Sequence, residues 1–94
     1  PMAIQTFRCP QTKQLFAGSR IKRFERFETV AMRKLVMLDA AAGLADLRAP
    51  PSNRLEPLRG DRSGQYSIRI NDQYRLCFSW TAAGPINVEI CDYH

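Results

Sequence analysis

Apolar residues in the first half of the chain recur at the spacing of an α-helix. Five of them follow one another at intervals of three or four, on one face of a helix that Gly43 would end: Phe27, Ala31, Leu35, Leu38 and Ala42. A shorter helix is predicted over residues 12–17, because Gly18 offers a left-handed stop after it. Residues 3–8 alternate only loosely and predict a weak first strand.

The second half of the chain changes to a period of two. Apolar residues alternate with polar ones over residues 66–70, 74–80 and 86–90, and turn-forming residues separate these runs. Each run therefore predicts a strand with one apolar face. A shorter strand is expected near residues 55–58. We expect an α+β protein whose twisted antiparallel sheet, of about four to five strands, packs on two N-terminal helices.

The length of the chain indicates one domain, over residues 1–94. Pro1, which precedes Met2, is expected to be a remnant of cloning. No stretch is apolar over the roughly 18–20 residues that a membrane span needs. No signal peptide is recognisable, so a cytoplasmic protein without a membrane partner is expected. The three cysteines lack C-x-x-C spacing and are expected to be reduced, mostly buried thiols.

The charge balance indicates a polyanionic partner, with nucleic acid as the first class to consider. Fourteen Lys and Arg against nine Asp and Glu give a net charge of +5, and eleven of the cations are Arg. The planar guanidinium binds phosphate with two N–H groups and stacks on bases. Residues 1–34 alone carry eight cations and two carboxylates. Arg26, Arg33 and Lys34 lie off the apolar stripe, where a solvated helix face is the alternative to a contact surface.

The alternation of the strands gathers basic residues on one face of the sheet. If Leu76 faces the helices, Arg75 faces away from them. Arg69 lies on the same face, as does Tyr93 if the pleat continues to the end of the chain. These arginines could simply be solvated on an open face, but their coincidence with the chemistry of the tail favours a site.

The chain ends on Asp92, Tyr93 and His94, and His94 is its only histidine. Imidazole exchanges protons near neutral pH, although a loosely held polar tail is the alternative interpretation. A proton-exchanging tail and arginines that hold a phosphate are together what metal-free RNA cleavage requires. Asp92 and His94 supply only two ligands, so no metal and no cofactor are expected.

Three segments resemble the HigB (host inhibition of growth) toxins, which belong to the RelE superfamily of bacterial toxin–antitoxin systems. They are Asn-Arg-Leu-Glu-Pro-Leu-Arg-Gly-Asp-Arg at 53–62, Gly-Gln-Tyr-Ser-Ile-Arg-Ile-Asn-Asp-Gln-Tyr-Arg-Leu-Cys-Phe at 64–78, and Val-Glu-Ile-Cys-Asp-Tyr-His at 88–94. The resemblance runs from about Ile4 to His94. The order and spacing of the segments, together with the terminal Asp-Tyr-His, carry it.

The resemblance implies a RelE-like fold and a ribosome-dependent endoribonuclease that cuts translated messenger RNA in the A site, inhibiting translation and growth. It implies a HigA-like helix-turn-helix antitoxin that neutralises the toxin, with operator DNA bound only through their complex. The functional residues of the family fall on five positions: Arg59, Arg75, Asp92, Tyr93 and His94. One position departs from the family, because Glu56 stands where relatives can have a histidine.

Cleavage by a ribose 2′-OH needs a base, an acid and cations around the phosphorus. His94 is the expected acid or base, and Asp92 would orient or assist it. Arg75 would hold the scissile phosphate with help from Arg59, and Tyr93 would stack on or position a base.

Glu56 is a candidate substitute base, with an ion pair to Arg54 or Arg59 as the alternative. Seven further cations are expected to contact RNA or the ribosome: Arg23, Arg26, Arg33, Lys34, Arg54, Arg62 and Arg69. Two other functions stay open, a noncatalytic RNA- or ribosome-binding module and a basic module that binds an acidic protein.

Overall fold

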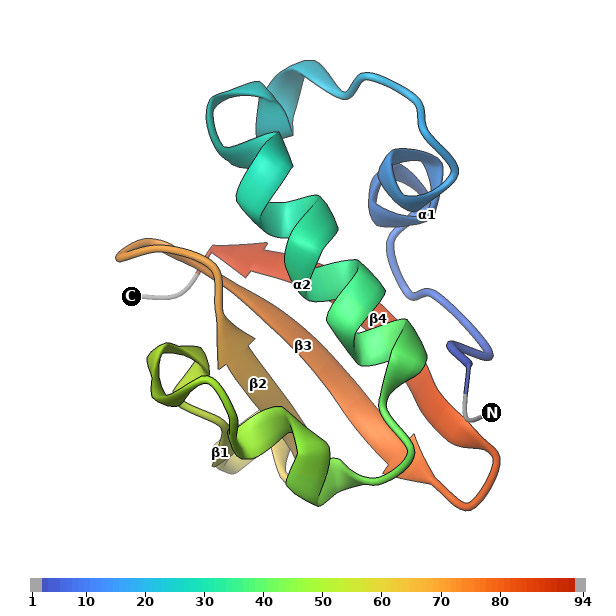
Figure 1. Cartoon of the computed structure of the whole chain (residues 1–94), viewed down its shortest axis with the longest axis vertical. Helices are drawn as coiled ribbons and strands as arrows, with labels where there is room; N and C mark the ends of the chain where they lie inside the picture. The colour runs from blue at the N-terminus through green and yellow to red at the C-terminus, as the bar shows by residue number, and fades with distance from the viewer. Residues whose placement is uncertain (1–2, 93–94) are drawn as a thin grey trace.

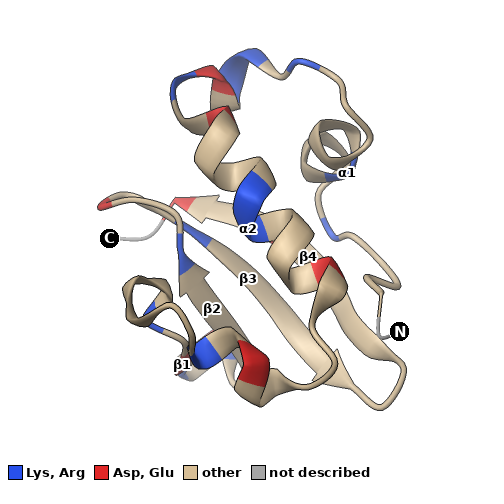
Figure 2. Ribbon diagram, in the orientation of Figure 1, with Lys and Arg blue, Asp and Glu red and all other residues tan. Residues whose placement is uncertain are grey.

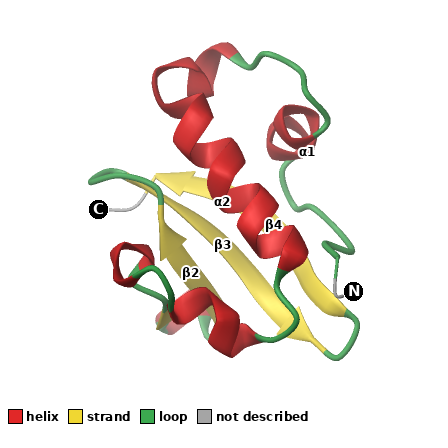
Figure 3. Ribbon diagram, in the orientation of Figure 1, coloured by secondary structure: helices red, strands yellow, loops and turns green. Residues whose placement is uncertain are grey.

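The computed structural model describes residues 3–92, in which two helices lie against one face of an antiparallel sheet (Figure 1). Helix α1 spans Pro10–Phe16 and helix α2 spans Glu28–Ala40. Four 3-10 segments connect the other elements: η1 (Lys22–Phe27), η2 (Leu44–Arg48), η3 (Pro51–Asn53) and η4 (Gly60–Arg62). Along the chain the helical segments precede the strands, except for η4 between β1 and β2. Figure 3 shows the helical segments and the strands in separate colours.

Helix α1 confirms the predicted short helix and starts earlier than expected. Pro10 stands in its first turn, where the missing N–H would have no partner within the helix. Gly18 follows the helix with a φ of 104°, a left-handed conformation that a side chain would make costly. Its N–H donates to the carbonyl of Leu15 at 2.9 Å and closes the last turn.

Helix α2 confirms the apolar stripe, since Ala31, Leu35 and Leu38 are fully buried. The predicted end of the helix was wrong, because α2 stops at Ala40 and not at Gly43. The N–H of Ala42 donates to the Asp46 carboxylate at 2.9 Å instead of to a helix carbonyl. This bond turns the chain towards η2, so Ala42 leaves the stripe and is exposed.

The sheet is a meander with the order β1-β2-β3-β4, and all three pairings are antiparallel. The strands are β1 (Glu56–Pro57), β2 (Gln65–Arg69), β3 (Tyr74–Thr81) and β4 (Gly84–Asp92). The three predicted alternating runs and the short strand near residues 55–58 are therefore confirmed. The register between β3 and β4 shifts between Cys77 and Ser79, opposite the left-handed Asn87.

The predicted first strand over residues 3–8 does not form. The segment runs beside β4 and makes a single parallel bridge, between Phe7 and Val88. Regular pairing fails because the backbone N–H of Asn87 donates to the side-chain hydroxyl of Thr6, at 2.8 Å, and not to a backbone carbonyl of this segment. Pro10 then begins α1 and leaves no room for a longer ladder.

Helix α2 crosses one face of the sheet (Figure 1). The core lies between the helices and this face. Phe24 and Leu35 meet Leu76 and Phe78 there, all of them fully buried. A smaller apolar cluster of Leu58, Cys77 and Cys91 lies on the opposite face of the sheet. All three cysteines carry free thiols, as predicted. Within residues 3–92, no helix is long and apolar enough to cross a membrane.

Candidate functional site

Arg75 is the centre of the candidate site, and the structure holds its guanidinium in place. Its Nε–H donates to Ser67 Oγ at 2.7 Å, and Nη2 donates to the carbonyl of Arg54 at 2.6 Å. Only 8% of the residue is exposed. A cation fixed by such bonds is preorganised, because it does not have to reorient when negative charge develops beside it.

The register confirms that Arg69 and Arg75 share the face of the sheet that points away from the helices. They are direct partners in the β2–β3 ladder, whereas Ile68 and Leu76 pair on the helix side. The expectation that this face is open was wrong at Arg75. The chain between Arg54 and Leu58 folds over it, and Leu58 packs on Cys77 and Cys91. Arg69 is less covered and forms an ion pair with Asp72.

Glu56 contacts the central arginine and not the arginines that are its neighbours in sequence. Its Oε1 lies 3.7 Å from Arg75 Nη2, and about half of the side chain is exposed. Glu56 pairs with Ser67 across the β1–β2 ladder, so both side chains lie on the face of Arg75. A carboxylate that could accept a proton therefore stands beside the fixed cation.

The C-terminal strand brings Asp92 to the end of the sheet at which Arg75 lies. Asp92 is the last residue of β4; it pairs with Tyr74 and accepts a hydrogen bond from Gln73 Nε2 at 3.1 Å. Cys91, immediately before it, is the register partner of Arg75. Tyr93 and His94, predicted as catalytic residues, lie outside the described residues.

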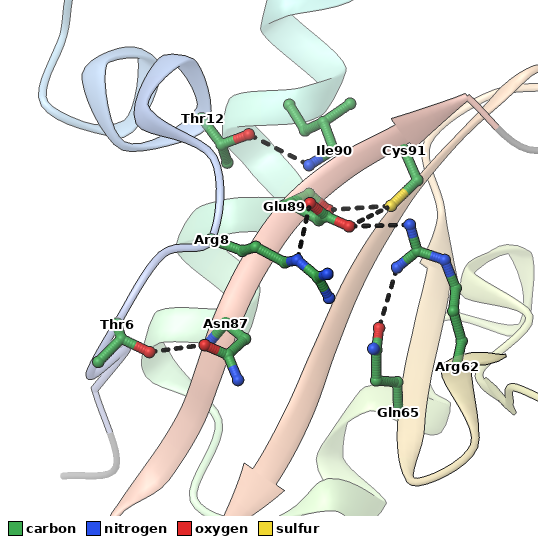
Figure 4. A network of polar contacts seen from close by, with 9 residues as sticks. All are labelled: Thr6, Arg8, Thr12, Arg62, Gln65, Asn87, Glu89, Ile90 and Cys91. Atoms are coloured by element: carbon green, nitrogen blue, oxygen red, sulfur yellow. Dashed lines mark hydrogen bonds and ion pairs between the residues drawn. The ribbon is translucent and has the colours of Figure 1, made fainter.

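The segment from η3 to η4 carries three further predicted arginines, which lie in different settings. Arg59 is exposed at the start of η4, and Arg54 is exposed after η3. Arg62 is held by the protein itself: Nη2 lies 2.9 Å from Glu89 Oε1, and Nη1 donates to Gln65 Oε1 at 3.0 Å (Figure 4). Arg62 therefore anchors the loop that presents Arg59.

Glu89 also contacts the pair of thiols, Cys77 and Cys91, on which this segment packs. The Cys91 thiol donates to Glu89 Oε1 at 3.3 Å (Figure 4). A hydrogen bond from Cys91 lowers the pKa of the Cys77 thiol against the opposing effect of burial, and Arg62 lowers it further. The contact with Cys77, together with burial, raises the pKa of Cys91.

Figure 2 shows that cations lie along the whole N-terminal third of the chain, on both helices and between them. Their side chains differ in exposure. Arg23, Arg26 and Arg33 are exposed, in line with a solvated face. The same expectation was wrong for Lys34, which is 7% exposed. Its Nζ donates to Asn53 Oδ1 at 2.6 Å. Burial lowers the pKa of Lys34, and the charges of Arg33 and Arg69 add to the effect.

Two hollows open on the described surface. One, of about 250 Å³, lies near Asp92 and has a cationic and aromatic lining: Arg23, Arg26, Phe27, Asn71, Gln73 and Tyr74. Phe27 and Tyr74 stack there with ring centres 4.4 Å apart. The other, of about 370 Å³, lies between the end of α1 and the start of α2 and contains none of the predicted site residues.

Ser67 and Asn53 are two fully buried residues that the sequence pattern did not predict as part of the site. Alternation could have placed Ser67 beside Arg75, since it is two residues from Arg69 on the same strand. The sequence around Asn53 did not indicate its hydrogen-bond partners, because they come from α2 and from η2. Within residues 3–92, no three His, Cys, Asp or Glu side chains gather as a metal site would require.

Comparison with known proteins identifies a family and a fold. The sequence profile of the HigB-like toxins, described as the RelE-like toxin of the type II toxin–antitoxin system HigB, matches residues 5–94. Toxin HigB-1 of Vibrio cholerae is 50% identical over 60 residues, which are 64% of this chain and 63% of that protein. An uncharacterised Haemophilus influenzae protein is 47% identical over 51 residues, 54% of this chain and 50% of its own length. The matches thus cover between half and two thirds of these curated relatives.

Solved structures show the same fold at low sequence identity. The YoeB–YefM complex from Staphylococcus aureus contains a chain with a TM-score of 0.56 and 21% identity, over 97% of both chains. The YoeB/ParE toxin from Agrobacterium tumefaciens has a TM-score of 0.55 and 19% identity, over 98% of both chains. These similarities establish the α+β arrangement of helices and sheet.

Proposed function

Because the chain belongs to the HigB-like family of RelE-like toxins of type II toxin–antitoxin systems, we propose that it cleaves messenger RNA on the ribosome. Cleavage of translated messages in the A site would stop translation and growth. The observation that carries this proposal is the preorganised guanidinium of Arg75, with a carboxylate at 3.7 Å and the end of β4 on the neighbouring strand.

The proposed reaction is the attack of a ribose 2′-OH on the adjacent phosphorus. The O–P bond forms as the 5′-oxygen leaves, so the products are a 2′,3′-cyclic phosphate and a 5′-hydroxyl. Arg75 offsets the charge that develops on the phosphoryl oxygens, with Arg59 as a second cation. One proton must leave the 2′-OH and another must reach the 5′-oxygen.

His94 and Glu56 are the two groups proposed to move these protons. His94 is the only imidazole of the chain and acts as acid or base, with Asp92 orienting it. Glu56 stands where relatives can have a histidine, and its contact with Arg75 supports a role as the base. Tyr93 is proposed to stack on an unpaired base of the message.

The surface near Asp92 supports RNA as the substrate. Arg23 and Arg26 supply charge for phosphates, and the stacked pair of Phe27 and Tyr74 supplies aromatic surface in the same hollow. Single-stranded nucleic acid is bound by this combination of cations and aromatic rings. We propose that these residues, with Arg33, Arg54, Arg62 and Arg69, form the contact surface for message and ribosome.

The proposed protein partner is a HigA-like helix-turn-helix antitoxin that neutralises the toxin. Membership of a toxin–antitoxin family supports this partner, and a related fold is found in the Staphylococcus aureus YoeB–YefM complex. Operator DNA would be bound only by the toxin–antitoxin complex.

Induced expression followed by mapping of message 5′ ends tests the proposed function directly. New 5′ ends should appear within translated reading frames and in phase with codons. Growth arrest without new 5′ ends would contradict a ribonuclease and favour a noncatalytic ribosome-binding module.

Cleavage is expected to need the ribosome and no added metal. The described part of the proposed site offers the carboxylates of Glu56 and Asp92 and one fixed arginine, so the alignment of the 2′-OH with its phosphate must come from elsewhere. Such alignment can contribute about 7–11 kcal/mol to catalysis, and the ribosome can supply it by holding the A-site codon. Naked RNA should therefore be cut slowly or not at all. Chelation should leave the intrinsic rate unchanged once the Mg²⁺ requirement of the ribosome is met, and efficient metal-stimulated cleavage of free RNA would contradict the mechanism.

Arg33→Ala should weaken binding to the ribosome more than it slows the chemical step. Arg33 is exposed on α2, and each phosphate contact changes the slope of log affinity against log salt by about 0.7–0.9. Equilibrium binding at several salt concentrations measures this slope. Arg48→Ala removes the same charge from η2 and controls for net charge. Equal losses of slope in both variants would argue against a specific contact.

A further inference from the structure

A buried polar contact ties helix α2 to the segment that covers Arg75. Lys34 Nζ donates to Asn53 Oδ1 at 2.6 Å, and both residues are buried. Asn53 Nδ2 donates in turn to the carbonyls of Leu47 and Ala49, at 3.1 and 3.3 Å. Both polar atoms of the Asn53 side chain are thus occupied, and the residue is fixed between α2 and the turn after η2.

The residue after Asn53 makes the contact with Arg75. Arg54 has a φ of 46° and a ψ of 53°, a left-handed conformation that a non-glycine residue keeps where its surroundings fix it. Its N–H donates to the carbonyl of Pro51 at 3.1 Å, and its carbonyl accepts from Arg75 Nη2 at 2.6 Å. The direction of this carbonyl therefore depends on the anchored position of Asn53.

The chemistry of Lys34 favours a positioning role over simple packing. An apolar side chain of similar length would fill the same space without the cost of burying an ammonium group. The ammonium is the group that meets Asn53 Oδ1, and without it a buried acceptor would lose its donor. The retained charge thus serves the contact with Asn53.

We propose that Lys34 is a positioning residue for Arg75, acting through Asn53 and the backbone carbonyl of Arg54. Its effect on cleavage rests on the proposed function, whereas its effect on the orientation of Arg75 does not. Loss of Lys34 would release Asn53, let Arg54 relax from its left-handed conformation and remove one of the bonds that orient the Arg75 guanidinium.

The side-chain NMR signal of Arg75 Nε–H tests the orientation without any assay of activity. In the wild-type protein the hydrogen bond to Ser67 should protect this proton from exchange with water. Lys34→Met should shift the signal and speed its exchange about tenfold or more, the amount that a lost bond of moderate strength implies. Lys34→Arg keeps a donor for Asn53 and should retain most of the protection.

Two controls separate positioning from general effects. Lys13→Met makes the same chemical change at an exposed position of α1 and should leave the Arg75 signal unchanged. Leu15→Ala lowers stability through the core, away from Asn53, and should also leave it unchanged. A wild-type signal in Lys34→Met, or an equal change in Leu15→Ala, would overturn the proposal.

Single-turnover cleavage on programmed ribosomes tests the consequence for chemistry. Lys34→Met should reduce the rate constant by about 10- to 100-fold, the loss expected from a misplaced catalytic group. The ribosome concentration at half-maximal rate should change by less than about twofold, because this buried lysine offers little surface to RNA. If the wild-type protein cleaves and Lys34→Met keeps its rate, positioning is contradicted. If the wild-type protein does not cleave, the proposed function fails. The NMR result then still tests whether Lys34 orients Arg75.

Discussion

Replacing Arg75 by alanine should raise the free-energy barrier to RNA cleavage by about 2–4 kcal/mol, the range for removal of a preorganised charge stabiliser. The guanidinium is fixed by Ser67 and by the carbonyl of Arg54 before any substrate arrives. Its interaction with the phosphoryl oxygens should strengthen as negative charge develops there. The loss should therefore fall on the rate constant of the chemical step and less on ribosome affinity.

Single-turnover cleavage on programmed ribosomes measures this loss. Arg75→Lys keeps the charge but not the planar fork that meets Ser67 and Arg54, so its rate should lie between wild type and Arg75→Ala. Arg69→Ala is the matched comparison, since Arg69 is the ladder partner of Arg75 on the same face. Its main effect should be a higher ribosome concentration at half-maximal rate. Similar losses of rate constant in Arg69→Ala and Arg75→Ala would contradict the central role of Arg75.

Deleting His94 should abolish growth arrest while leaving the protein folded. His94 is the only imidazole of the chain, and general acid–base catalysis contributes about 10²–10⁴-fold to such reactions. The core between the helices and the sheet is built by residues that the structure describes, with Leu35, Leu76 and Phe78 fully buried. A loss of activity should therefore occur without a loss of stability.

Growth after induction and circular dichroism of the purified variant measure the two effects. His94→Gln provides the matched control, because glutamine retains hydrogen-bonding groups but does not exchange a proton near neutral pH. It should be as inactive as the deletion. A folded deletion variant that still arrests growth would assign the proton transfers to other groups, with Glu56 as the first candidate.

Local sequence determined the two helices, the four strands and the face on which each strand residue lies, but not the end of α2 or the conformation of residues 3–8. Successive side chains of a strand alternate, so Arg69 and Arg75 had to share a face once Ile68 and Leu76 pointed into the core. The spacing of Ala31, Leu35 and Leu38 likewise determined the buried face of α2. These features follow from the periodicity of the backbone, which the order of residues close together in sequence reveals.

The covering of Arg75 depended on chain segments that meet only in the folded protein. Residues 54–58 return over the second face of the sheet, and no pattern within β3 shows that they do so. The ion pair between Glu56 and Arg75 likewise forms only because these segments meet in the folded protein. Arg54 and Arg59 are closer in sequence, but pairing of Glu56 with Ser67 places the carboxylate beside Arg75.

Lys34 shows the limit of the sequence pattern most directly. A lysine beside an apolar helical stripe is normally solvated, since burial of an ammonium group is costly unless a partner meets it. That partner is Asn53, nineteen residues further along the chain. Periodicity fixed the helix and the two faces of the sheet because it acts between neighbours. Only the tertiary structure decided which polar groups are buried, because a buried polar group needs a partner and distant segments supply it.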